Sequence, residues 1–279
     1  MTVGNSAAVP LTWLYVPGDR SDRVGKALAG DADVVIVDLE DAVLPTAKAL
    51  ARQTVSSILS GIERPVQVRV NAPSSPWGAD DLTAVRGLPP RVGVRIPRCE
   101  SAAEIAEIAH TVGDRALHIL VESALGLERA VELATAHPRV TSVGLGEADL
   151  RAQLGVSGDV GLGWARGRIV NAAAAGRLPS PAMSVFAEIR DSPGLAASCR
   201  IGRALGFVGQ AAIPPVQLSV IRECFTPTAA EIRRAREVVE AAEAGESSGH
   251  GAVALPDGRF VDPAIVLQAR RVLLLATGR

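Results

Sequence analysis

The chain has 279 residues, which suits one large domain or two small ones, and its 48% hydrophobic and 21% charged residues predict a full buried core. Its 29 Lys and Arg balance 30 Asp and Glu, and its aromatic residues are three Trp, one Tyr and four Phe, so we expect neither a nucleic-acid-binding nor a membrane-binding surface. The three scattered cysteines, with no secretory signal and no apolar run of membrane-spanning length, predict a cytoplasmic protein.

Short apolar runs alternate with alanine-rich helical patterns along most of the chain. The predicted strands are Trp13–Val16, Val34–Asp38, Val66–Val70, Val92–Ile96, Leu117–Val121, Thr141–Leu145, Ala182–Phe186 and Val208–Ile213. The predicted helices between them include Ser21–Ala29, Ala47–Leu59, Ser101–Thr111, Leu125–Ala136, Gly163–Ala175 and Gly194–Leu205. This alternation predicts an α/β fold, a (β/α)8 TIM barrel, with a doubly wound open sheet as the alternative.

The pattern changes after Phe225. A long helix is predicted over Ala229–Ala244, and Thr228 with Glu231 has the spacing of a capping box at its start. A Gly/Ser-rich break, Gly245–Gly251, precedes a last amphipathic helix over Asp262–Ala276. We therefore predict a barrel carrying a metal site over residues 1–225 and a C-terminal helical extension or lid over 226–279, within the same domain.

Acidic and basic residues stand where predicted strands end, and reactive groups of a barrel gather there. Strand two ends in Asp38-Leu39-Glu40-Asp41, which is either a solvated acidic loop or a group that holds a cation or accepts a proton. In strand three, Arg69 alternates with valines and so faces the barrel interior, where its charge needs an anion. That anion is a structural carboxylate or, as we favour, a substrate carboxylate.

Two further acids follow neighbouring strands. Glu122 and Asp149 are 27 residues apart (positions 122 and 149), which is one strand–helix repeat. Two carboxylates with open positions suit Mg²⁺, although acids at strand ends also cap the next helix. Other chemistries find little support, because the histidines lack the HxxxH spacing of zinc sites, and GxSxG, Walker A and GxGxxG motifs are absent. The only lysines, Lys26 and Lys48, fall in predicted helices, which argues against imine chemistry.

Several of these runs together resemble the citrate lyase β-subunit (CitE-like) group of the HpcH/HpaI aldolase superfamily. The runs that carry the resemblance are Leu14-Tyr15-Val16-Pro17-Gly18, Val37-Asp38-Leu39-Glu40-Asp41-Ala42-Val43 with Lys48 and Arg52, Val68-Arg69-Val70-Asn71, Glu122-Ser123-Ala124, Gly146-Glu147-Ala148-Asp149-Leu150 with Leu154-Gly155, Leu205-Gly206-Phe207, Phe225-Thr226-Pro227 and Asp257-Gly258-Arg259-Phe260-Val261-Asp262. They extend from about residue 12 to residue 276 in the family's order. Each run is short, but their succession is specific.

The resemblance implies a Mg²⁺-dependent barrel enzyme, a homo-oligomer such as a trimer or hexamer, that acts on a coenzyme A thioester and a 2-oxo acid. It implies a carbon–carbon lyase that cleaves or forms a 3-hydroxyacyl-CoA, such as citryl-CoA or a malyl-CoA-like thioester, through a metal-stabilised enolate. By motif, the metal ligands would be Glu122 and Asp149, and Arg69 would clamp the substrate, with Glu147 and Ala148 beside it. Glu40 and Asp41 would hold metal-bound water. Asp262 would be an acid that the C-terminal lid places in a neighbouring subunit's site.

The chain departs from the family pattern at two positions. It reads Ile213-Pro214-Pro215-Val216-Gln217 where many relatives have a His after the Ile, and Gly209-Gln210 where they have Gly-Lys. These changes put the usual coenzyme A contacts or the substrate choice in doubt. The alternatives are a class II aldolase releasing pyruvate, an acyl-CoA thioesterase, and a non-catalytic barrel that only binds its ligand.

Overall fold

The computed structural model describes residues 9–247, 253–255 and 258–277, which form two compact units. The larger unit is Leu11–Arg222, and the smaller one consists mainly of Glu223–Arg279. Within the described residues, no helix is both long enough and apolar enough to cross a membrane.

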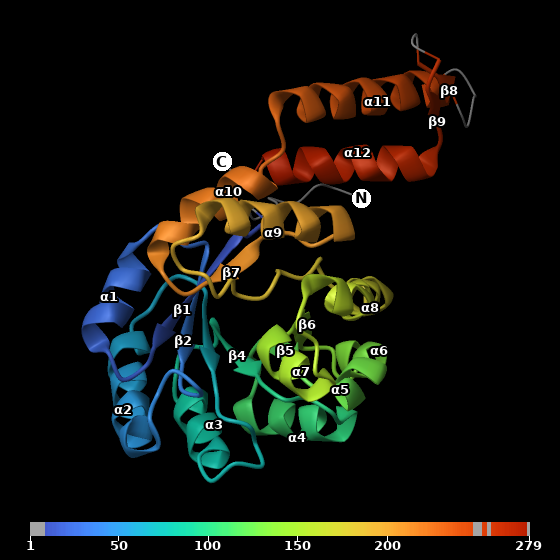
Figure 1. Ribbon diagram of the computed structural model, residues 1–279. Helices are drawn as coiled ribbons and strands as arrows, with labels where there is room; N and C mark the ends of the chain where they lie inside the picture. Colours follow the sequence, from blue (N-terminus) through green and yellow to red (C-terminus); the bar gives the residue numbers. More distant parts are fainter. Residues whose placement is uncertain (1–8, 248–252, 256–257, 278–279) are drawn as a thin grey trace. The chain divides into compact units, whose positions relative to one another are not determined.

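The larger unit contains a seven-stranded, wholly parallel sheet that curls into an open barrel with helices outside it (Figure 1). The strand order is β6-β5-β4-β3-β2-β1-β7. The strands are β1 (Thr12–Pro17), β2 (Val34–Asp38), β3 (Val66–Arg69), β4 (Val92–Ile96), β5 (Leu117–Val121), β6 (Val140–Leu145) and β7 (Gln210–Ala212). The predicted α/β barrel is thereby confirmed, since consecutive strands β1 to β6 are neighbours, as in a barrel and unlike a doubly wound sheet.

The predicted strand Ala182–Phe186 forms one isolated bridge, between Met183 and Gln210, rather than a full strand. Its backbone pairs with the start of β7 through hydrogen bonds that include Met183 N to Gly209 O at 3.0 Å and Ala211 N to Met183 O at 2.9 Å. Toward the other edge of the sheet, the Ser184 hydroxyl donates to the Leu145 carbonyl of β6. Pro179 and Pro181 lack the N–H groups that would extend the ladder before Met183, and after Met183 the partner strand β7 itself ends at Ala212.

The helices of this unit cover the outer face of the sheet. They are α1 (Ser21–Ala29), α2 (Lys48–Leu59), α3 (Gly78–Arg86), α4 (Ala102–Val112), α5 (Ala124–Glu128), α6 (Ala130–Ala134), α7 (Glu147–Leu154), α8 (Gly163–Ala175), α9 (Ser192–Leu205) and, across the unit boundary, α10 (Leu218–Phe225). Short 3₁₀ turns occupy Pro45–Ala47, Asp159–Leu162 and Pro215–Gln217. The predicted helix Leu125–Ala136 was wrong as one element, because the backbone leaves helical geometry at Arg129 (φ −89°, ψ 8°) between α5 and α6.

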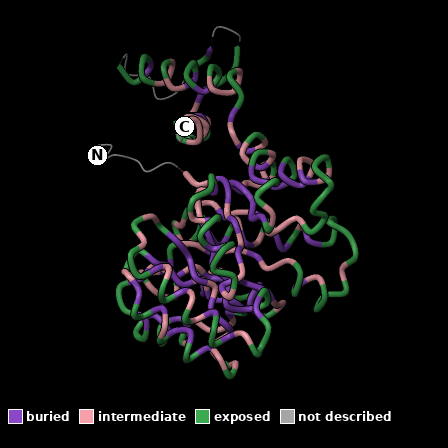
Figure 2. Tube along the Cα trace, turned by 90° about the vertical axis from the view of Figure 1, so that its left-hand side faces the viewer, coloured by how far each residue is buried: buried purple, intermediate pink, exposed green. Residues whose placement is uncertain are grey.

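Strand register decides which side chains enter the barrel. Val66 and Val68 of β3 face the helices and are fully buried, as are Val92 and Val94 of β4. Figure 2 shows the buried residues concentrated in the interior of the larger unit. The intervening residues face the interior, so polar side chains such as Arg69 project toward the barrel axis.

The smaller unit is a helical hairpin with a short β-hairpin. Helices α11 (Ala229–Ser247) and α12 (Pro263–Ala276) pack together, and β8 (Val253–Ala254) pairs antiparallel with β9 (Phe260–Val261). Its buried core comprises Ala235, Val238, Leu255, Val261 and Ala269. The predicted capping box is present, since Thr228 N donates to Glu231 Oε2 at 2.7 Å and Glu231 N donates to Thr228 Oγ1 at 3.2 Å. Of the predicted Gly/Ser-rich break, residues 245–247 extend α11, and the remainder lies outside the described residues.

Candidate active site

The acidic segment after β2 is fixed by Asp38, whose side chain is 1% exposed. Its carboxylate accepts hydrogen bonds from Glu40 N at 2.9 Å and from Ala42 N at 3.0 Å. Asp38 thereby turns the chain sharply at the end of the strand, so that Glu40 is buried and Asp41 is exposed. The interpretation of this run as a solvated acidic loop therefore fails for Asp38 and Glu40.

Arg69, the last residue of β3, lies against these acids. Its Nε and Nη2 donate to the two carboxylate oxygens of Asp38 at 2.7 and 2.6 Å. Its Nη1 lies 3.0 Å from Glu40 Oε2 and 3.3 Å from Asp41 Oδ2. A structural carboxylate thus neutralises Arg69, as one of the two sequence interpretations has it, while its remaining edge faces the other acids of the site.

Lys48 of α2 binds the backbone of the same acidic segment. Its ammonium donates to the carbonyls of Leu39 and Glu40 and to Asn71 Oδ1, each at 2.7 Å. Asn71 Nδ2 in turn donates to Leu39 O at 2.8 Å and to Asp81 Oδ2 at 2.6 Å. Burial lowers the pKa of Lys48, and the charges of Asp38 and Asp81 oppose this change. These bonds fix the backbone from which Glu40 and Asp41 project.

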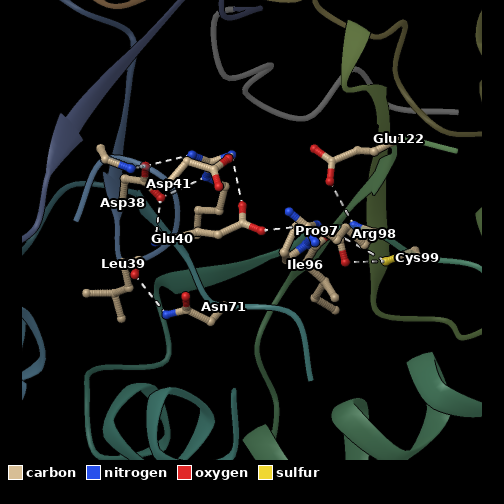
Figure 3. Close-up of polar contacts among 12 residues, drawn as sticks. Asp38, Leu39, Glu40, Asp41, Asn71, Ile96, Pro97, Arg98, Cys99 and Glu122 are labelled. Atoms are coloured by element: carbon tan, nitrogen blue, oxygen red, sulfur yellow. Dashed lines mark hydrogen bonds and ion pairs between the residues drawn. The ribbon is translucent and has the colours of Figure 1, made fainter. Parts of the chain in front are cut away.

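Glu122 follows β5 and is 5% exposed. Its Oε2 accepts a 2.9 Å hydrogen bond from the backbone N–H of Arg98, a residue with a left-handed backbone (φ 53°) just after β4. Arg98 also reaches Glu40, with 3.7 Å between Nε and Oε1, so Glu40 and Glu122 both contact this one residue (Figure 3). Gly146, after β6, leaves room for Glu122, because an added Cβ would lie 2.4 Å from its Cγ and Oε1.

The two buried carboxyls have strongly raised pKa values. Burial raises the pKa of Glu40 to about 8, opposed by the charge of Arg69 and assisted by Asp41 and Glu122. Burial likewise raises the pKa of Glu122 to about 7, opposed by Arg69 and the Arg98 N–H and assisted by the charge of Asp149. Mutually repelling acids in a buried site are typical of a cation-binding or proton-transferring centre.

The residues of the segment after β6 differ in their environment. Asp149, in the first turn of α7, is exposed, and its effect on Glu122 shows that the two carboxylates are close enough to interact. Glu147 is engaged by Arg166, whose Nε and Nη2 donate to its carboxylate at 2.8 and 2.7 Å. Ala148 is exposed. A substrate-binding role for Glu147 would have to coexist with this bidentate ion pair.

The site residues fit a magnesium ion by their chemistry. Oxygen ligands from one or two carboxylates, completed by water and substrate, are what Mg²⁺ takes in proteins, and Glu122 with Asp149 supplies such a set. Glu40 Oε2 is buried and forms an ion pair with Arg69 Nη1 at 3.0 Å, but it accepts no well-directed hydrogen bond among the described residues, so it adds an acceptor beside them. Within the described residues, no three or more His, Cys, Asp or Glu side chains come together in a group that could hold a metal. Besides Glu122 and Asp149, the ion would therefore need water and substrate oxygens as ligands.

Asp262 lies in the smaller unit, where it caps α12 by accepting a 2.9 Å hydrogen bond from Ile265 N. Its role in a neighbouring subunit stays a prediction.

Of the two departures from the family pattern, Gln210 is buried between β7 and α9, bonded to Ser184 O, Ser198 Oγ and Cys199 Sγ. Gln210 is therefore a core residue. Pro214 is only partly buried, and its neighbour Ile213 is half exposed.

Sequence reasoning missed Arg98 as a member of the site. The available signal was its position, because Pro97-Arg98-Cys99 follows β4 directly and so lies at the same edge as the ends of β3 and β5. Its charge alone gave no indication, since the backbone N–H, rather than the side chain, binds Glu122.

Known proteins resemble this chain in sequence and in fold. A family model described as HpcH/HpaI aldolase/citrate lyase matches residues 11–215. The chain is 36% identical to a (3S)-malyl-CoA thioesterase of Cereibacter sphaeroides, over 94% of this chain and 93% of the relative, and 34% identical to the citrate lyase subunit beta of Escherichia coli, over 93% and 91%. It is also similar to the crystal structure of CitE from Mycobacterium tuberculosis in complex with magnesium, acetoacetate and coenzyme A, with a TM-score of 0.81, 34% identity and coverage of 97% and 99%.

Proposed function

Because the chain belongs to the HpcH/HpaI aldolase/citrate lyase family, we propose that it is a Mg²⁺-dependent carbon–carbon lyase acting on a coenzyme A thioester. Its substrate would be a 3-hydroxyacyl-CoA, such as citryl-CoA or a malyl-CoA-like thioester, divided into an acyl-CoA and a 2-oxo acid. The observation that supports this most is the buried cluster of Glu40 and Glu122 around Arg98, beside the Asp38–Arg69 pair.

Glu122 and Asp149 would hold the ion, in line with the magnesium complex of the similar CitE structure. When bound, Mg²⁺ supplies a Lewis acid that polarises the oxygens of an acid substrate. The remaining work falls to side chains of this chain, which bind the substrate, orient it and move its proton.

Arg69 provides a fixed positive charge at the edge of the site. Because Asp38 holds two of its nitrogens, the guanidinium cannot rotate freely, and Nη1 stays directed toward Glu40 and Asp41. A preorganised donor of this kind stabilises oxyanion charge by about 3 kcal/mol. Arg69 would therefore act on the developing charge of the substrate.

Glu40 is the proposed proton carrier. With a pKa of about 8 its carboxyl holds a proton at neutral pH, and burial keeps that proton away from bulk water. It can give the proton to substrate oxygen and take it back, as a general acid and base. Exposed Asp41 would position water at the mouth of the same site.

Metal-linked binding of a 2-oxo acid tests the proposed site. We expect Mg²⁺ binding, measured by calorimetry, to strengthen when oxaloacetate or glyoxylate is present, and Glu122→Gln to abolish this linkage. Glu132→Gln, an exposed glutamate of α6, is the matched control and should behave like wild type. Mg²⁺ binding without acid linkage in wild type would favour the non-catalytic barrel.

Asp262 is the proposed acid from the neighbouring subunit of a homo-oligomer. Asp262→Asn keeps a side-chain oxygen that can cap α12, so it should leave the unfolding transition in place while lowering kcat. Mixing this variant with Glu122→Gln should restore part of the activity if each site draws on two chains. Full turnover by Asp262→Asn would contradict the assignment.

A second candidate is hydrolysis of the thioester, favoured by the 36% identity to a malyl-CoA thioesterase. Product analysis separates the two reactions, because a lyase acting on malyl-CoA yields acetyl-CoA and glyoxylate, whereas a thioesterase yields free coenzyme A and malate. Turnover of a 4-hydroxy-2-oxo acid without any thioester would instead identify a class II aldolase.

A further inference from the structure

A second arginine, Arg95 of β4, enters the same barrel. In the sheet register Arg69 pairs with Arg95, Arg95 with His118, and His118 with Ser142, so all four side chains lie on the interior face, in one layer. Neighbouring strands are only about 4.8 Å apart, so two guanidinium groups project from adjacent positions into a confined space.

The two arginines differ in how their charges are met. Arg69 is paired with Asp38 and lies near Glu40 and Asp41. Arg95 donates from Nε to Gln67 Oε1 at 2.9 Å, and no Asp or Glu forms an ion pair with it in the described part of the chain. A neutral amide is its acceptor, so its positive charge in the interior has no counter-ion from the protein.

The neighbouring side chain, His118, does not supply a negative charge to Arg95. His118 lies next to Arg95, with its Nδ1 2.9 Å from Ser142 Oγ. Burial, together with the charge of Arg95, lowers the pKa of His118 to about 3, so the ring is neutral at physiological pH. The layer therefore carries one uncompensated positive charge among neutral polar groups.

Two glycines at the end of β6, Gly144 and Gly146, leave the space into which Arg95 and Glu122 project. At Gly144 of β6 an added Cβ would lie 3.8 Å from Arg95 Nη1. Two residues further on, Gly146 faces Glu122 in the same way. Arg95 Nη1 thus extends toward β6 on the same face of that strand as Glu122. It lies two residues deeper in the barrel than Glu122, because Gly144 precedes Gly146 by two residues.

We propose that Arg95 is a specificity-determining residue that binds a second carboxylate of the substrate acid, at the deep end of the site. This inference rests on the proposed function and deepens it. An acid whose first carboxylate is held through the Mg²⁺ that Glu122 and Asp149 would bind would present its other end to Arg95. Acids with two carboxylates would gain a charge-assisted hydrogen bond, and acids with one would leave Arg95 unpaired.

The test compares oxaloacetate, which has two carboxylates, with pyruvate, which has one, in calorimetric titrations of the full chain with Mg²⁺ present. We expect Arg95→Met to weaken oxaloacetate binding about tenfold to a hundredfold, the range of a lost hydrogen bond to a charged group, and pyruvate binding less than about twofold. Arg95→Lys should restore part of the oxaloacetate affinity. Arg86→Met, at an exposed position of α3, is the control for removal of a guanidinium.

The outcomes separate this inference from the proposed function. Equal losses for both acids, or none, overturn the role of Arg95, and so does failure of wild type to bind oxaloacetate, even when thioester cleavage is intact. Selective loss in Arg95→Met supports it, also where no thioester is cleaved and the proposed lyase activity fails. Urea unfolding of each variant verifies that the barrel is folded.

Discussion

Replacing Lys48 with methionine tests how the acidic segment is held. Methionine keeps an apolar stem that can pack near Trp77, whose ring centroid lies 5.1 Å from the ammonium, but removes all three 2.7 Å hydrogen bonds. Leu39 O keeps a donor in Asn71 Nδ2, and Glu40 O keeps one in the backbone N–H of Val43 at 3.0 Å, whereas Asn71 Oδ1 loses its donor.

One buried acceptor without a donor costs about 1–3 kcal/mol, and each of the two lost bonds from the ammonium to a carbonyl contributes about 1.5–3 kcal/mol. Removing a partly desolvated ammonium offsets part of this, so we expect the free energy of unfolding to fall by about 3 kcal/mol. With a urea dependence of about 2 kcal/mol per molar, the unfolding midpoint falls by about 1.5 M.

The chain supplies its own control, because Lys26 is the only other lysine and is exposed on α1. Lys26→Met should shift the midpoint by less than about 0.3 M, in line with the small effect of most surface substitutions. Tryptophan fluorescence during urea titration measures both variants. Equal midpoints for Lys48→Met and Lys26→Met would refute the reasoning, since the three bonds would then contribute nothing net.

Two further changes test the walls of the site. Gly146→Ala places a methyl group 2.4 Å from Glu122, so this carboxylate must move, and calorimetry should show loss of acid-linked Mg²⁺ binding, whereas Gly167→Ala, inside α8 with no atom within 4 Å, should raise stability by about 0.5–1 kcal/mol. Unchanged binding in Gly146→Ala would show that the position of Glu122 is not critical. His118 titrates near 6.5 when unfolded and near 3 when folded, so the unfolded state binds more protons between these values and stability falls as pH decreases through that window. At pH 5 this amounts to about 2 kcal/mol, and His118→Gln should remove that part of the acid sensitivity, as urea unfolding at pH 7 and pH 5 would show; identical pH profiles for the two proteins would contradict the assigned burial.

The fold was largely predictable because its pattern is local. Ser21–Ala29 and Gly163–Ala175 are helices over the predicted residues, and Val34–Asp38, Val92–Ile96 and Leu117–Val121 are strands over theirs. Each begins or ends at a clear change of hydrophobic period. The segment Ala182–Phe186 failed as a strand because its pairing depends on partners distant in sequence and on two preceding prolines, which periodicity does not weigh.

The site was predictable in its members more than in their connections. The position of Asp38, Arg69 and Glu122 follows from strand ends and alternation. Arg69 donates to both carboxylate oxygens of Asp38 rather than to a substrate, and this pairing depends on side-chain geometry that sequence spacing does not specify. The burial that raises the pKa values of Glu40 and Glu122 depends likewise on the whole enclosure.

The left-handed backbone of Arg98 has a consequence for protein engineering. A non-glycine residue at φ 53° costs about 1–2 kcal/mol, a cost that glycine avoids. Stability-guided redesign would therefore favour glycine at position 98. That substitution would keep the N–H that binds Glu122 but remove the guanidinium 3.7 Å from Glu40, so thermal tolerance and the charge balance of the site pull this position in opposite directions.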